Sequence, residues 1–132
     1  MNHTQPTGKL FILYGPSGSG KSTLLAEIVK KIPAHFIWPV ITYTSRLPRA
    51  NEINGKDYYF ISEEDFLKKL NSGFFIHTTN YSGNYYGCPR NILDELQEGK
   101  NLIAIFDRVG AEEVKHSIPD SVLIWVTASL KE

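Results

Sequence analysis

Gly15-Pro16-Ser17-Gly18-Ser19-Gly20-Lys21-Ser22 fits the spacing G-x-x-x-x-G-K-[ST] of a phosphate-binding loop. Before it, residues 9–14 form a short apolar run typical of a buried strand. After it, apolar residues recur at helical spacing, at Leu24, Leu25, Ile28, Val29 and Ile32. A strand, a glycine-rich loop and a helix in this order are the context that the motif requires. The stretch therefore predicts a P-loop and a fold organised around it.

The residue types of this loop suit a bound phosphate. Gly15, Gly18 and Gly20 let the backbone turn tightly and bring several N–H groups round one anion. The helix that begins at Lys21 turns its positive dipole end to the same anion. Lys21 adds a mobile positive charge for the outer phosphates, and the hydroxyl of Ser22 suits Mg²⁺. The alternative is a glycine- and serine-rich turn that precedes a helix by chance.

Length and composition narrow the possible classes of protein. The 132 residues suit one domain, and the 14 basic and 14 acidic residues cancel, so we expect no nucleic-acid partner and no membrane. Residues 1–8 are polar, and we expect them to be a flexible leader. The single cysteine, Cys88, cannot form an internal disulfide, which favours a reducing, cytoplasmic location.

Two further apolar runs, residues 102–106 and 122–126, alternate with helical patterns. Together with the first run they predict an α/β fold, a P-loop NTPase-type parallel sheet flanked by helices. Asp107 follows the second run, at the edge of the sheet where ligands of α/β proteins bind. We expect residues 9–35 and 89–132 to form this P-loop core.

The segment between the first two core strands, residues 36–88, is rich in Tyr, Thr, Ser and Arg. We expect it to be an inserted small mixed α+β region, and a polar insertion of this kind is the place to look for a second substrate. Within it, residues 58–61 predict a strand, Ser62 to Asp65 a helix-starting capping box, residues 74–79 an extended segment, and residues 81–87 a loop with short strand character.

Basic and phenolic side chains gather in this insert. Arg46 and Arg49 are three residues apart, and arginine forks bind phosphate in a bidentate way. Hydroxyl donors come from Tyr58, Tyr81, Tyr85 and Tyr86. The residue types alone fit a nucleotide monophosphate pocket and a pair of solvated loops equally well.

Four stretches together resemble the guanylate kinase family. They are residues 15–24, GPSGSGKSTL; 44–49, TSRLPR; 54–60, NGKDYYF; and 82–87, SGNYYG. They occur in the family's order and at its spacing, and the resemblance covers nearly the whole chain from about Lys9. The P-loop is shared by many families, whereas the second and third stretches are more particular to this one.

The resemblance implies transfer of the γ-phosphoryl group of ATP, bound with Mg²⁺, to GMP. It assigns ATP to Gly15, Pro16, Ser17, Gly18, Ser19, Gly20, Lys21, Ser22 and Thr23. It assigns GMP to Thr42, Arg46, Arg49, Tyr58, His77, Tyr86, Cys88 and Asp107. Lys21 and Arg46 would be the catalytic residues, and Ser22 and Asp107 the metal-side residues.

The chain also departs from the family. His77 stands where the family has a guanine-reading glutamate, and neutral imidazole offers only one acceptor. Cys88 replaces a serine or threonine, and Ile105 replaces the first aspartate of a D-x-D pair. The family continues beyond the position of Glu132 with an arginine-bearing lid, a strand and a helix. Without these elements we expect the chain to bind phosphates better than it turns over.

Two alternatives stay open at this point. Ribose bisphosphate kinases are similar to guanylate kinases but lack the base-reading carboxylate, so a small phosphorylated acceptor other than GMP is one of them. The other is a binding module without turnover, as in guanylate-kinase-like domains of scaffold proteins, although those usually have a damaged P-loop.

Overall fold

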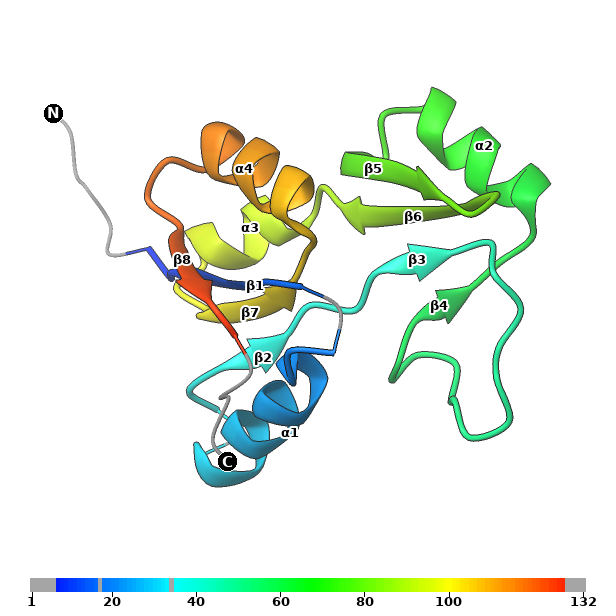
Figure 1. Ribbon diagram of the computed structural model, residues 1–132. Coiled ribbons are helices and arrows are strands. Elements are labelled where there is room, and N and C mark those ends of the chain that lie inside the picture. The colour runs from blue at the N-terminus through cyan, green and yellow to red at the C-terminus, as the bar shows by residue number, and fades with distance from the viewer. Residues whose placement is uncertain (1–6, 17, 34, 128–132) are drawn as a thin grey trace, which may run out of the picture. The chain divides into compact units, whose positions relative to one another are not determined.

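The computed structural model describes residues 7–16, 18–33 and 35–127. The chain divides into two compact units. We call the first, Met1–Pro39 with Leu93–Glu132, the core unit, and the second, Val40–Ile92, the insert unit. Figure 1 shows the elements of each.

The core unit is built on a four-stranded parallel sheet in the order β2-β7-β1-β8. The strands are β1 (Leu10–Tyr14), β2 (Trp38–Pro39), β7 (Leu102–Ile105) and β8 (Val122–Trp125). The helix α1 (Lys21–Lys31) lies on one face, while α3 (Ile92–Gln97) and α4 (Arg108–Ser117) lie on the other (Figure 1). The predicted α/β class, a parallel sheet flanked by helices, is confirmed.

Apolar side chains on both faces explain why these strands read as continuous hydrophobic runs. Leu13, Ile103 and Val126 are buried at the centre of one cluster, against which half-buried side chains of α1 and the sheet pack. β2 is an edge strand that pairs with β7 alone in this sheet. An edge tolerates Pro39, which has no N–H to donate.

The insert unit contains a second sheet in the order β4-β3-β6-β5. β3 (Tyr43–Thr44) and β4 (Tyr59–Phe60) are parallel, whereas β5 (Phe75–Tyr81) and β6 (Asn84–Pro89) form an antiparallel hairpin. The short strand character expected within residues 81–87 is confirmed, but the strands take up most of this segment and the loop is only a turn. The chain turns at Ser82 (φ 52°) and Gly83 (φ 81°), a two-residue hairpin turn that lets β6 begin at Asn84.

One helix, α2 (Glu63–Asn71), covers this second sheet. The hydroxyl of Ser62 accepts a hydrogen bond of 3.0 Å from the amide of Asp65, so the predicted helix start at Ser62 is confirmed. Phe66 of α2 is fully buried and stacks on Phe75 at 4.5 Å and on Tyr85 at 5.2 Å between ring centroids. These stacked rings are the centre of the insert unit.

Candidate functional site: a phosphate loop and an arginine pocket

The P-loop follows β1 and leads directly into α1. Gly20 is the N-cap of α1 in a left-handed conformation, φ 93° and ψ 18°. Because glycine has no side chain, no capping oxygen covers the first-turn amides, and a helix N-terminus left in this way attracts an anion. Of the predicted ATP residues, Ser17 lies outside the described residues.

The ammonium of Lys21 folds back over the loop. Its Nζ donates to the carbonyl oxygens of Gly15 and, at 3.1 Å, of Pro16. Ser19 is buried, and its Oγ has no hydrogen-bond partner within the described part of the chain. Ser22 and Thr23 are exposed on the first turn of α1. The loop thus presents one cation and several hydroxyl groups around the helix N-terminus.

Asp107 lies at the same edge of the core sheet as the P-loop. Leu13 of β1 pairs with Ile105 of β7. Gly15 follows Leu13 by two residues and Asp107 follows Ile105 by two residues, so both come just after the ends of neighbouring strands. The Oδ1 of Asp107 accepts a 2.7 Å hydrogen bond from the amide of Gly110 and caps α4. This cap explains why α4 begins at Arg108.

These groups fit a magnesium ion held mainly by a nucleotide. Among the described residues there is no cluster of three or more His, Cys, Asp or Glu side chains that could hold a metal alone. Mg²⁺ commonly binds through one or two carboxylates together with substrate phosphates and water. The second carboxylate oxygen of Asp107 and the exposed hydroxyl oxygen of Ser22 are the protein ligands that such a magnesium ion would use.

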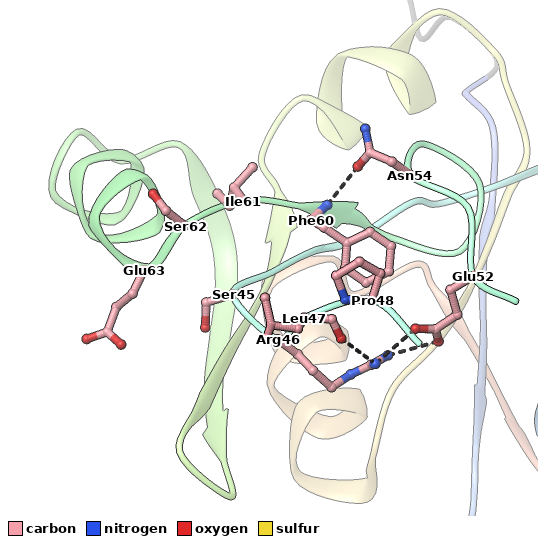
Figure 2. A pocket seen from close by; sticks show the side chains of 10 residues that line it. All are labelled: Ser45, Arg46, Leu47, Pro48, Glu52, Asn54, Phe60, Ile61, Ser62 and Glu63. Carbon is pink, nitrogen blue, oxygen red and sulfur yellow. Dashed lines mark hydrogen bonds and ion pairs between the residues drawn. The ribbon is translucent and has the colours of Figure 1, made fainter. Parts of the chain in front are cut away.

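The insert unit holds a pocket of about 680 Å³. It is lined by Ser45, Arg46, Leu47, Pro48, Glu52, Asn54, Phe60, Ile61, Ser62 and Glu63. Figure 2 shows Arg46 reaching toward Glu52, while Glu63 points away from both. Arg46 donates from Nη1 to Oε1 and from Nη2 to Oε2 of Glu52, each at 2.9 Å. This fork is the best-defined charged pair of the insert unit.

Aromatic side chains surround the same guanidinium. The Cζ of Arg46 lies 5.3 Å from the ring centroid of Tyr58 and 5.9 Å from that of Phe60. Tyr86 packs on Tyr58 at 5.9 Å between centroids. Glu52 first, and then Tyr86 and Tyr58 through smaller contributions, raise the pKa of Arg46 above its ordinary value. The pKa of Tyr58 is also raised, chiefly by burial. The structure thus brings together Arg46, Tyr58 and Tyr86.

The remaining predicted acceptor residues of the insert unit have different environments. The side chain of Arg49 is exposed, and its amide donates to Oε1 of Glu52 at 2.8 Å. Thr42 is half-buried, and its carbonyl accepts from Tyr59. His77 on β5 pairs in register with Cys88 on β6.

Cys88 is 1% exposed, and burial raises the pKa of its thiol to about 12. In this structure the thiol is a buried side chain and does not line the 680 Å³ pocket.

Arg90 and Arg108 make hydrogen bonds and ion pairs within their own units. Arg90 donates to the carbonyls of Gly73 and Phe75, and Arg108 pairs with Glu112 at 3.4 Å.

Sequence reasoning missed Glu52 and Asn54. Glu52 completes the arginine fork, and Asn54 Oδ1 accepts a 2.9 Å hydrogen bond from the amide of Phe60, which closes the loop behind the pocket. Asn54 entered the sequence analysis only as part of the 54–60 stretch of the family resemblance. The available signal was one acidic residue close to two arginines, a spacing that exposed loops also show.

A P-loop at the carboxyl edge of a parallel sheet, with helices on both faces, defines the class of P-loop nucleotide-binding proteins. The family model described as guanylate kinase matches residues 7–132. The chain belongs to the guanylate kinase family.

Individual relatives agree with this assignment. The chain is 43% identical over 121 residues to a guanylate kinase of Lactobacillus acidophilus, covering 91% of this chain and 59% of that protein. It is 37% identical over 121 residues to a guanylate kinase of Trichormus variabilis, covering 91% and 60%. The crystal structure of guanylate kinase from Anaplasma phagocytophilum matches with a TM-score of 0.76 and 28% identity, covering 92% and 60%. The chain thus spans about 60% of the length of these relatives.

In the part of the chain that the structure describes, no helix is long and apolar enough to cross a membrane.

Proposed function

We propose that this chain carries the ATP-binding and acceptor-binding parts of a guanylate kinase. The reaction is transfer of the γ-phosphoryl group from ATP to GMP, which yields ADP and GDP. The observation that carries the proposal is the uncapped N-terminus of α1 at Gly20, with Lys21 folded over the loop beside it. The similarity to proteins named guanylate kinase supports GMP as the acceptor.

Each half of the proposed site has a defined task. The amides of the first turn of α1 and the ammonium of Lys21 bind and orient the triphosphate. Magnesium, when bound with ATP, neutralises developing charge, and Ser22 and Asp107 are the residues that would hold it. Arg46, with the hydroxyl groups of Tyr58 and Tyr86, would hold the acceptor phosphate, because a guanidinium binds phosphate with two N–H donors.

The proposed acceptor set also includes Thr42, Arg49, His77, Cys88 and Asp107. In the structure, His77 and Cys88 are opposed on the β5–β6 hairpin, which places them together on one sheet. A cytoplasmic location, expected from the lone cysteine, remains a prediction. The similarity to guanylate kinases does not favour the sugar-phosphate kinase or the module without turnover.

Isothermal titration tests the nucleotide half. Lys21→Ala should lower the affinity for a non-hydrolysable ATP analogue by about tenfold or more, since a hydrogen bond to a charged group contributes ~1.5–3 kcal/mol. Lys30→Ala, on the same helix and in an exposed ion pair with Glu27, is the matched control. Unchanged ATP affinity in Lys21→Ala would rule out the P-loop assignment.

Titration with GMP, AMP and CMP tests the acceptor half. We expect GMP to bind most tightly of the three. Equal, millimolar binding of all three nucleotides would rule out guanine as the recognised base.

A further inference from the structure

The guanidinium of Arg46 has five N–H donors in a fixed planar arrangement. Nη1 donates to Oε1 of Glu52 and to the carbonyl of Leu47, at 2.9 and 3.1 Å. Nη2 donates to Oε2 of Glu52 at 2.9 Å. Glu52 therefore occupies the end-on fork formed by Nη1 and Nη2. The second, side-on fork consists of Nε–H and the other Nη2–H, and Glu52 does not use it. The hydroxyl groups of Tyr86 and Tyr58 also interact with this guanidinium, so an acceptor phosphate would bind among these groups.

Glu52 also organises the backbone of the same loop. Its Oε1 accepts from the amide of Arg49 at 2.8 Å, and its own amide donates to the carbonyl of Arg49 at 3.0 Å. The amide of Arg46 in turn donates to Oγ1 of the buried Thr44 at 3.1 Å. Both ends of the loop are thus fixed, and the side chains of Arg46 and Glu52 are only 12% and 19% exposed.

We propose that Glu52 is a positioning residue for the acceptor phosphate: it holds one fork of Arg46 and the amide of Arg49, so that the other fork of Arg46 is presented in one orientation. The proposal rests on the proposed function and adds to it a residue that does not touch the substrate. An arginine side chain has about 2 kcal/mol of rotamer entropy. Because Glu52 already restricts the Arg46 side chain, less rotamer entropy is lost when the phosphate binds.

An alternative role for Glu52 predicts the opposite change in phosphate affinity when this residue is substituted. A carboxylate beside a phosphate site repels the incoming anion, so a Glu52 that only blocked Arg46 would weaken binding. Removal of its charge would then tighten binding. The two roles therefore predict opposite changes for one substitution.

The experiment compares Glu52→Gln with wild type in isothermal titration against GMP, ribose 5-phosphate and guanosine. Glutamine keeps the size of the side chain but replaces one acceptor with a donor, which cannot face the guanidinium. We expect the affinities for GMP and ribose 5-phosphate to fall by about tenfold or more, consistent with a charged hydrogen bond. The affinities for guanosine and an ATP analogue should stay at wild-type values.

Glu64→Gln is the matched control, because Glu64 is in the same unit and makes only an exposed 3.9 Å ion pair with Lys68. It should behave as wild type with every ligand. In the Arg46→Lys background, Glu52→Gln should have less than about a twofold further effect, because contacts that act through one partner are not additive.

Equal or tighter binding of GMP by Glu52→Gln overturns the proposal. A parallel loss with guanosine also overturns it, since that result indicates general damage to the fold. If wild type binds ribose 5-phosphate but not GMP, the proposed function fails, and the role of Glu52 is still decided by ribose 5-phosphate.

A measurement on the wild-type chain covers the case in which Glu52→Gln does not fold. The chain has four arginines, Arg46, Arg49, Arg90 and Arg108, so their Nε–H signals can be assigned by nuclear magnetic resonance. Ribose 5-phosphate should shift the Nε–H signal of Arg46, a donor that Glu52 does not use. An unshifted signal at saturation contradicts the proposal.

Discussion

The α-carbon of Gly15 faces the carbonyl oxygen of Val126 so closely that an added β-carbon would lie 2.0 Å from that oxygen. The neighbour is backbone at the end of β8, where Val126 donates its amide to Tyr14, so it cannot move aside cheaply. We predict that Gly15→Ala displaces the P-loop from β8, lowers the melting temperature and abolishes measurable binding of an ATP analogue.

Gly18→Ala is the control for this substitution. A β-carbon at Gly18 would meet nothing within 4 Å, although its φ of +78° strains any L-residue by about 1–2 kcal/mol. Gly15→Ala should therefore reduce both the melting temperature and the ATP affinity more than Gly18→Ala does. Equal effects would show that backbone strain matters and the contact with Val126 does not.

Asp107 has two separable tasks, and two substitutions distinguish them. Asparagine caps helices as well as aspartate does, so Asp107→Asn should keep the 2.7 Å hydrogen bond to Gly110 and the wild-type melting temperature. It should weaken the magnesium-dependent part of ATP binding. Asp107→Ala should show the same loss and also destabilise the fold by about 0.5–2 kcal/mol. Wild-type magnesium dependence in Asp107→Asn would contradict the metal-side assignment.

The sequence predicted the core sheet well because local patterns determine it. Residues 102–106 and 122–126 are uninterrupted apolar runs, and the glycine-lysine loop has a fixed spacing. The order β2-β7-β1-β8 was not predictable in the same way, since pairing joins residues far apart in the chain. The β5–β6 hairpin was missed because Ser82 is a non-glycine residue with positive φ, and the Asn, Gly and Tyr residues around it resemble a loop.

The candidate site was predictable only in part, for a related reason. Arg46 and Tyr58 belong to a motif, so their types and spacing carry information. Glu52 by itself gives no information about the site, because an acidic residue in a loop is usually solvated. Its importance comes from lying 2.9 Å from both terminal nitrogens of Arg46, a relation that exists only in the folded loop. The burial of Cys88 likewise depends on the packing around β6.

Gly87 of β6 has no room for a side chain. A β-carbon there would lie 2.6 Å from ring atoms of Phe75 and 2.9 Å from Phe66, and both rings are buried. Overpacking of this kind costs about 1–3 kcal/mol, so Gly87→Ala should lower the unfolding free energy by that amount in urea denaturation. Gly83→Asn is the control, because the turn position is open and asparagine tolerates positive φ. A Gly87→Ala protein as stable as Gly83→Asn would mean that the two rings can move.

The Arg46–Glu52 pair predicts a specific effect of acid. Arg46 lowers the pKa of Glu52 from 4.5 to about 2. The stabilisation is therefore fully present above pH 4.5 and is lost as the pH falls toward 2. Wild type should lose unfolding free energy more steeply than Glu52→Gln between these pH values, as measured by urea denaturation at each pH. Glu64→Gln should follow the wild-type curve, and parallel curves for wild type and Glu52→Gln would contradict the pairing in solution.

The thiol of Cys88 should be unreactive while the protein is folded. Burial raises its pKa to about 12, and only the thiolate reacts with disulfide reagents. At pH 8 we predict that an aromatic disulfide reagent labels the folded chain at least about a hundredfold more slowly than the chain in urea, since folding removes both the thiolate and access to it. The urea sample is the positive control, and a bound acceptor phosphate should not change the folded rate. Fast, stoichiometric labelling without urea would show that Cys88 is open to solvent and would contradict this prediction.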